Sequence, residues 1–124
     1  MSDFSRQVRL WSEKAKKNMD TVVNDATQTV ARLAQDRAPE VTGELKESIK
    51  VWINGRLIGE GQTGYQSATA QAKAGDVILV GWTAEHAVIA EYGASDGRQG
   101  HFYVRGAAIQ WDNIVREAIR RLPK

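Results

Sequence analysis

The feature that most constrains the fold is a long helix signal at the amino terminus. Residues 4–38 contain neither glycine nor proline, and their apolar residues recur at the spacing of one helical face. These residues are Phe4, Val8, Trp11, Ala15, Met19, Val22, Ala26, Val30 and Leu33. Eight steps cover 29 residues, which is about 3.6 residues per step, the α-helical period. The sequence therefore predicts one amphipathic helix over residues 4–38.

This helix is long for a chain of 124 residues. At a rise of about 1.5 Å per residue it would extend on the order of 50 Å, more than a compact domain of this size can cover. We therefore expect either a break in the helix or a part of it, including Trp11 and Met19, that contacts another subunit.

A short turn is expected after the long helix. Pro39 ends that helix, because it disfavours helical geometry in the residue before it and has no backbone N–H. Thr42 is the expected N-cap of a short helical turn, and Gly43 permits a tight backbone path there. Ile49, Val51 and Ile53 then alternate with polar or amphipathic residues, which predicts a half-buried strand continuing as far as Leu57 and Ile58.

The segment 55–75 is rich in glycine, with Gly55, Gly59, Gly61, Gly64 and Gly75. Its low apolar content predicts a long hairpin or loop outside the core, of the kind that often has a function. Residues 76–82 are apolar on both faces, which predicts a central strand covered on two sides.

The rest of the chain is expected to be helical. A short helix over residues 84–92 should end at Gly93, and one amphipathic helix is predicted over residues 104–122. The order of elements predicts a single α+β domain over residues 1–124, with a small, mainly antiparallel sheet and the last two helices packed on it.

Composition excludes several classes of chemistry. The chain has no cysteine, so thiol catalysis, thiolate zinc sites and disulfides are ruled out. No apolar run is long enough for a membrane span, and the amino terminus does not resemble a signal peptide. Synthesis in the cytoplasm without export is therefore expected.

No cofactor or metal site is predicted. His86, His101 and nearby carboxylates lack the spacing of metal-binding motifs. Gly59, Gly61 and Gly64 match the spacing of a dinucleotide-binding loop, but no strong parallel strand precedes them and no apolar-periodic helix follows. We interpret that match as coincidence.

Catalytic residues are not predicted either. Glu85 and Glu91 could form an acid and base pair only if one of them had a raised pKa in a pocket, and six residues apart on a helix they face largely opposite sides. The simpler interpretation is that Glu91 binds a backbone amide or a nearby arginine.

The four tryptophans, Trp11, Trp52, Trp82 and Trp111, all lie on or beside apolar stripes, where core packing is the default. Trp52 lies on the strand face opposite Ile49, Val51 and Ile53, which makes it a candidate for a subunit interface. The full candidate interface comprises Trp11, Met19, Trp52, Gly59, Gly61, Gly64 and Tyr65.

The net charge of +2 is small, and basic residues are concentrated near the two ends of the chain. A dedicated DNA-binding protein usually has a stronger and more continuous basic surface. A small DNA-associated regulatory or binding protein therefore remains the alternative to a structural role.

Two ordered sequence blocks resemble a known family. The first is Ala38-Pro39-x-x-Thr42-Gly43-x-Leu45-x-x-Ser48-Ile49, after the long helix. The second comprises residues 86–94, with Glu91-Tyr92-Gly93, and residues 101–107, with Phe102. Together they resemble the neck and tail-component proteins of long-tailed double-stranded DNA bacteriophages, also called tail-completion or head-to-tail joining proteins. His86, His101 and Gly106 depart from the family pattern.

The resemblance implies a structural virion protein without catalytic activity. Such a subunit would form a homo-oligomeric ring around the DNA channel of the neck or tail, with head-completion and tail terminator or tail-tube proteins as partners. The motif residues to which it assigns a structural role are Pro39, Thr42, Gly43, Leu45, Ser48, Ile49, Glu91, Tyr92, Gly93 and Phe102.

Overall fold

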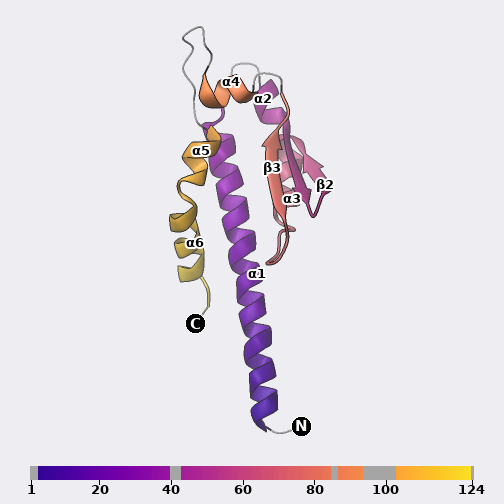
Figure 1. Cartoon of the computed structure of the whole chain (residues 1–124), viewed down its shortest axis with the longest axis vertical. Helices are drawn as coiled ribbons and strands as arrows, with labels where there is room; N and C mark the ends of the chain where they lie inside the picture. Colours follow the sequence, from indigo (N-terminus) through magenta and orange to yellow (C-terminus); the bar gives the residue numbers. More distant parts are fainter. Residues whose placement is uncertain (1–2, 40–42, 85–86, 94–102, 124) are drawn as a thin grey trace.

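The computed structural model describes residues 3–39, 43–84, 87–93 and 103–123 (Figure 1). Thr42, His86, His101 and Phe102 lie outside the described residues. The elements, in order, are α1 (Asp3–Arg37), α2 (Glu44–Glu47), β1 (Ile49–Ile53), β2 (Arg56–Glu60), α3 (Gly61–Thr69), β3 (Ile78–Trp82), α4 (Ala87–Tyr92), α5 (Tyr103–Ala108) and α6 (Trp111–Arg120). The fold is α+β, as predicted.

Helix α1 is continuous from Asp3 to Arg37, which confirms the predicted long helix. Its carboxyl half lies between the sheet and the pair α5 and α6, while its amino half extends well beyond every other labelled element (Figure 1). Small residues allow this close packing, because Ala26, Ala31 and Ala34 are all buried. By contrast, every residue from Asp3 to Lys17 is exposed. The helix is therefore unbroken, and only its second half belongs to the core.

The three strands form an antiparallel sheet with the order β2-β1-β3. The prediction that residues 76–82 form the central strand, covered on both faces, is wrong. Strand β1 is central and β3 is an edge strand, with Leu79 60% exposed and Val77, just before the strand, 72% exposed. Alternate residues of a strand point to opposite faces, and in the described structure the face that holds Leu79 is not covered by a helix.

The predicted continuation of the first strand through Leu57 and Ile58 is also wrong, because the chain reverses at Asn54 and Gly55. Both residues have positive φ, 54° and 81°, as a two-residue type I′ hairpin turn requires. The Asn54 side chain also accepts a hydrogen bond from the Val77 N–H at 2.9 Å. The turn therefore fixes β2 beside β1 and also helps to place the start of β3.

The glycine-rich segment 55–75 is not a loop outside the core. It contains β2 and α3, and α3 places Tyr65 and Ala68 in the main core cluster with Val51. A Cβ at Gly59 would lie 2.6 Å from the Gly64 carbonyl oxygen and 2.8 Å from the Ala68 Cβ. Gly59 thus allows α3 to pack closely on β2. A count of apolar residues does not reveal this role of a glycine.

The single carboxyl-terminal helix predicted over residues 104–122 is instead two helices, α5 and α6. The chain turns at Ile109 and Gln110, and this change of direction lets both helices pack along α1. Helix α6 buries Ile114 and Ala118, and Arg121, just after it, pairs with Asp25 of α1 at 2.8 Å.

The packing of α3 predicts that Tyr65 is needed for stability. Tyr65→Ala should lower the free energy of unfolding by about 3–5 kcal/mol, the usual cost of removing a buried aromatic side chain. Gln66→Ala, at the next, exposed position, should change it by less than about 0.5 kcal/mol. Chemical denaturation followed by circular dichroism measures both. Equal stability of the two variants would show that α3 is not part of the core.

Candidate functional site

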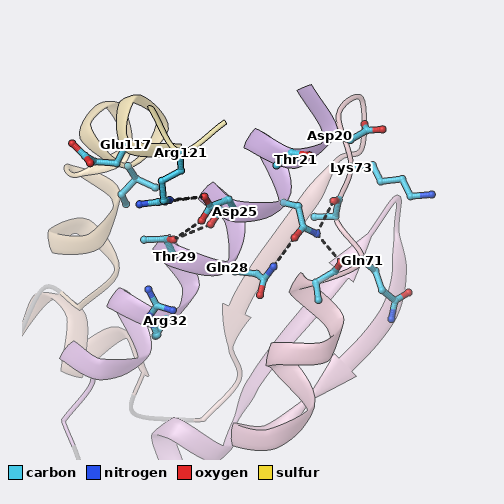
Figure 2. Close-up of a pocket in the computed structure, with 14 residues that line it drawn as sticks. Asp20, Thr21, Asp25, Gln28, Thr29, Arg32, Gln71, Lys73, Glu117 and Arg121 are labelled. Atoms are coloured by element: carbon cyan, nitrogen blue, oxygen red, sulfur yellow. Dashed lines mark hydrogen bonds and ion pairs between the residues drawn. The ribbon is translucent and has the colours of Figure 1, made fainter. Parts of the chain in front are cut away.

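A cleft lies between α1, α6 and residues 70–73, with a volume of about 690 Å³ (Figure 2). Its polar groups largely connect elements of the fold. Arg121 binds the Asp25 carboxylate, and the Asn24 side-chain amide donates to the carbonyl oxygens of Ala70 and Ala72 at 2.6 and 3.0 Å. These contacts anchor α6 and the end of α3 to α1, so the cleft is a junction between elements.

Among the residues that the structure describes, no three His, Asp or Glu side chains lie close enough together to bind a metal ion. None of the helices in this described part has the length and apolar character of a membrane span.

The motif turn is built as its glycine suggests. Gly43 has φ +78° and immediately precedes α2, and its carbonyl oxygen accepts a hydrogen bond from the Glu47 N–H at 3.0 Å. Leu45 is buried with Ala38, Ala87 and Tyr103. The turn therefore places the Leu45 side chain in the core at this end of the domain. The positive φ of Gly43, which favours glycine, makes the turn possible.

The other described motif residues extend this junction. Pro39 is half-buried at the end of α1, and Ile49 is fully buried at the start of β1. The Ser48 carbonyl oxygen accepts hydrogen bonds from both the backbone N–H and the hydroxyl of Thr83. Ser48 thus links the motif turn to the end of β3.

A buried amide connects the motif turn to α1 and the sheet. Gln35 is 4% exposed, and its Nε2 donates to the Lys46 carbonyl oxygen at 2.7 Å. Its Oε1 accepts from the indole Nε1 of Trp82 at 2.8 Å. Trp82 in turn makes an edge-to-face contact with Tyr103, with ring centroids 5.0 Å apart. One side chain therefore joins α1, α2 and β3.

Glu91 caps a helix. Its carboxylate accepts hydrogen bonds from the N–H groups of Val104 and Arg105 at 2.8 and 2.9 Å, at the amino end of α5 where N–H groups lack partners within the helix. This confirms the first of the two partners expected for Glu91, a backbone amide or a nearby arginine. Burial, and secondarily the negative charge of Glu91, raise the pKa of Tyr103 to about 12.

The neighbours of Glu91 in the motif have local roles. Gly93 has φ +89° and directly follows α4, which agrees with the predicted stop. Tyr92 is exposed, and the Arg105 guanidinium lies 5.7 Å from the centre of its ring.

The candidate interface residues fall into two groups. Trp11 and Met19 are 68% and 59% exposed on α1, and Trp52 is half-buried on β1. In contrast, Tyr65 and Gly61 are buried within the chain, Gly59 packs against α3, and Gly64 lies on the opposite side of that contact. The interface prediction for the glycine-rich segment needs correction, because this segment packs inside the subunit.

Three exposed apolar residues near Trp52 were not predicted as interface residues. Leu57 and Leu79 are the cross-strand partners of Trp52 in β2 and β3, and Val77 lies just before β3. The Asn54-Gly55 dipeptide is the sequence signal that could have placed Leu57 opposite Trp52, because a two-residue turn at this dipeptide sets the pairing of the two strands.

The connection through Gln35 predicts a large effect of one substitution. Gln35→Leu preserves the approximate volume but leaves the Trp82 N–H and the Lys46 carbonyl without their partners. An unsatisfied buried group costs about 1–3 kcal/mol, so the free energy of unfolding should fall by roughly that amount for each group that water cannot reach. Asp36→Ala, at the adjacent exposed position, is the control. An unchanged melting temperature of Gln35→Leu would contradict the role given to this amide.

Comparison with protein families supports the resemblance seen in the sequence. A family described as bacteriophage HK97-gp10, putative tail-component, matches residues 2–93. Comparison with curated proteins and with solved structures gives no match. The family match includes α1, the motif turn, the sheet and α4, and it ends before α5. Because it covers most of the chain, this protein belongs to the HK97-gp10-like family of bacteriophage tail components.

Proposed function

We propose that this chain is a non-enzymatic subunit of a ring in the phage neck or tail, which joins or completes the connection between head and tail around the DNA channel. The family match supports a structural tail component. The observation that carries the finer proposal is the amino half of α1, which has large apolar residues in solvent and no covering element among the described residues.

We call residues 3–19 the arm. Its exposed large apolar side chains are Phe4, Val8, Leu10, Trp11 and Met19. Most helical stability in proteins comes from tertiary packing of an amphipathic face, and exposed apolar patches typically mark protein interfaces. A role in assembly gives this surface a partner, whereas a monomeric protein would leave it in water.

The charge of the arm suits a position near DNA. Arg6, Arg9 and Lys17 lie on the helix side opposite Phe4 and Trp11, as the 100° step per residue requires, and all three are exposed. Glu13 lies on the same side. In a ring, the apolar side could contact protein while the basic side faces the channel. Head-completion and tail terminator or tail-tube proteins are the proposed partners above and below.

The same basic side is the observation behind the alternative, a small DNA-associated regulator. The two functions differ in the salt dependence of DNA binding. Several specific phosphate contacts make affinity fall steeply with added salt, whereas a channel that lets DNA slide needs only weak binding. Tight DNA binding by the purified protein, with a steep salt dependence, would favour the regulator.

The proposed function predicts the phenotype of a phage that lacks this protein. Removing the gene from a phage or prophage that carries it should give DNA-filled heads and separate tails that fail to join or to stay joined, as seen by electron microscopy. The protein supplied from a plasmid should restore plaques and should be detected in purified virions by immunoblotting. Normal virions without the protein, or complementation without its incorporation, would contradict a structural role.

A further inference from the structure

The sheet has an apolar face that no described helix covers. Leu57, Trp52 and Leu79 form one cross-strand row on β2, β1 and β3. The indole of Trp52 lies over Gly81, where an added Cβ would be 3.6 Å from the ring. Helix α3 and Ala31 of α1 pack on the opposite face, with Val51 and Ile53. We call Leu57, Trp52, Leu79 and Val77 the outer sheet face.

The arm is the second uncovered apolar surface of the chain. Phe4, Val8, Trp11, Ala15 and Met19 fall within an arc of about 80° around the helix axis. This stripe continues the side of α1 on which Met19 and Val22 line a groove with Ile119 and Leu122. Beyond that groove, toward the amino terminus, no described element covers the stripe. Phe4 and Trp11 alone, 73% and 68% exposed, present on the order of 300 Å² to solvent.

The two surfaces cannot meet within one chain. Helix α1 is continuous, and its carboxyl half is fixed against the inner side of the sheet. The arm extends away from the sheet along the same axis (Figure 1). It could reach the outer sheet face of its own chain only if the helix broke and folded back.

We propose that the arm of one copy lies across the outer sheet face of the next copy and thereby joins neighbouring subunits of the ring. This inference rests on the proposed ring. The contact is heterologous, since two different surfaces meet, and repeating it around an axis produces a closed ring or an open helical assembly. Each subunit then has its arm and its outer sheet face buried, one by each neighbour.

The dimensions of the two surfaces agree. A helix with its side chains is about 10 Å wide, and the arm is about 25 Å long. Three strands of five residues form a face of about 14 Å by 17 Å, so one helix is sufficient cover. A helix packed on a sheet is also the ordinary way in which proteins bury an apolar sheet face.

The rival contact, arm against arm, explains less. An isologous pair of arms would bury Phe4 and Trp11 but would leave Trp52 and Leu79 in solvent. It would also give a two-fold dimer, which by itself does not extend around a ring. The head-to-tail contact accounts for both surfaces with one interaction.

Cysteine cross-linking in virions tests the proposal, because the chain has no native cysteine. Ala15→Cys places a thiol in the middle of the arm stripe, and Leu79→Cys places one on the outer sheet face. Both residues are exposed, and Trp11 and Trp52 are retained. In phage that carry the double variant, a short bismaleimide should produce a ladder of dimers, trimers and larger species on a denaturing gel.

Matched variants identify the contact. Lys17→Cys with Leu79→Cys puts the first thiol on the basic side of the arm and should give little or no ladder. Each single variant should remain monomeric on the gel. A dimer from Ala15→Cys alone would indicate arm-to-arm packing, and a cross-link to a different virion protein would identify another occupant. Either result, or no cross-link in virions that contain the protein, would overturn the proposal.

The test also separates this inference from the proposed function. If the protein is absent from virions, the proposed function fails, and the same variants are then cross-linked as purified protein at high concentration. A ladder restricted to the Ala15→Cys and Leu79→Cys double variant would still support the head-to-tail contact. Monomers only would overturn it.

Discussion

The described fold depends on the buried amide of Gln35. A glutamine in the interior must find partners for both its oxygen and its nitrogen. Here the Nε2 donates to the Lys46 carbonyl and the Oε1 accepts from the Trp82 indole. Because an indole N–H only donates and a carbonyl only accepts, the amide has one orientation that satisfies both. Helix α1, the motif turn and β3 are thereby fixed relative to one another.

Trp82 extends this connection to the rest of the molecule. Its ring packs against both core clusters, the one under the sheet and the one around Leu45 and Tyr103. Tyr103 begins α5, whose amino end is capped by Glu91. A chain of direct contacts therefore runs from α1 through the sheet to α5.

The division of α1 into two halves relates the fold to the function. In the carboxyl half, alanines are buried on several sides of the helix, which places it between two layers. In the amino half, one side is apolar and the opposite side carries three basic residues together with Glu13 and Leu10, and all described residues up to Lys17 are exposed. The carboxyl half has the buried small residues that a core requires, and the amino half has the exposed apolar side that a partner requires. A tail component in a larger assembly accounts for both.

Much of this architecture could be predicted from residue patterns. The period of 3.6 residues identified α1 to within one residue at each end, because a helical face repeats locally along the chain. Gly43 and Gly93 identified backbone positions with positive φ, since only glycine adopts them without strain. Of the two partners expected for Glu91, a backbone amide or a nearby arginine, the structure shows backbone amides. Each of these inferences depends on local geometry, which the sequence encodes directly.

The sequence did not reveal where the elements pack. The low apolar content of segment 55–75 predicts a long hairpin or loop outside the core, yet Gly59 permits a contact with α3 that brings Tyr65 into the core. Strand β3 was placed at the centre of the sheet because its residues are apolar on both faces, yet it is an edge strand with Leu79 exposed. The sequence by itself determined the long helix, the turns at Gly43 and Gly93 and the apolar character of each segment, because these follow from neighbouring residues. Only the tertiary structure decided which apolar surfaces are buried within the chain and which are left for a partner, because burial depends on what residues distant in sequence cover.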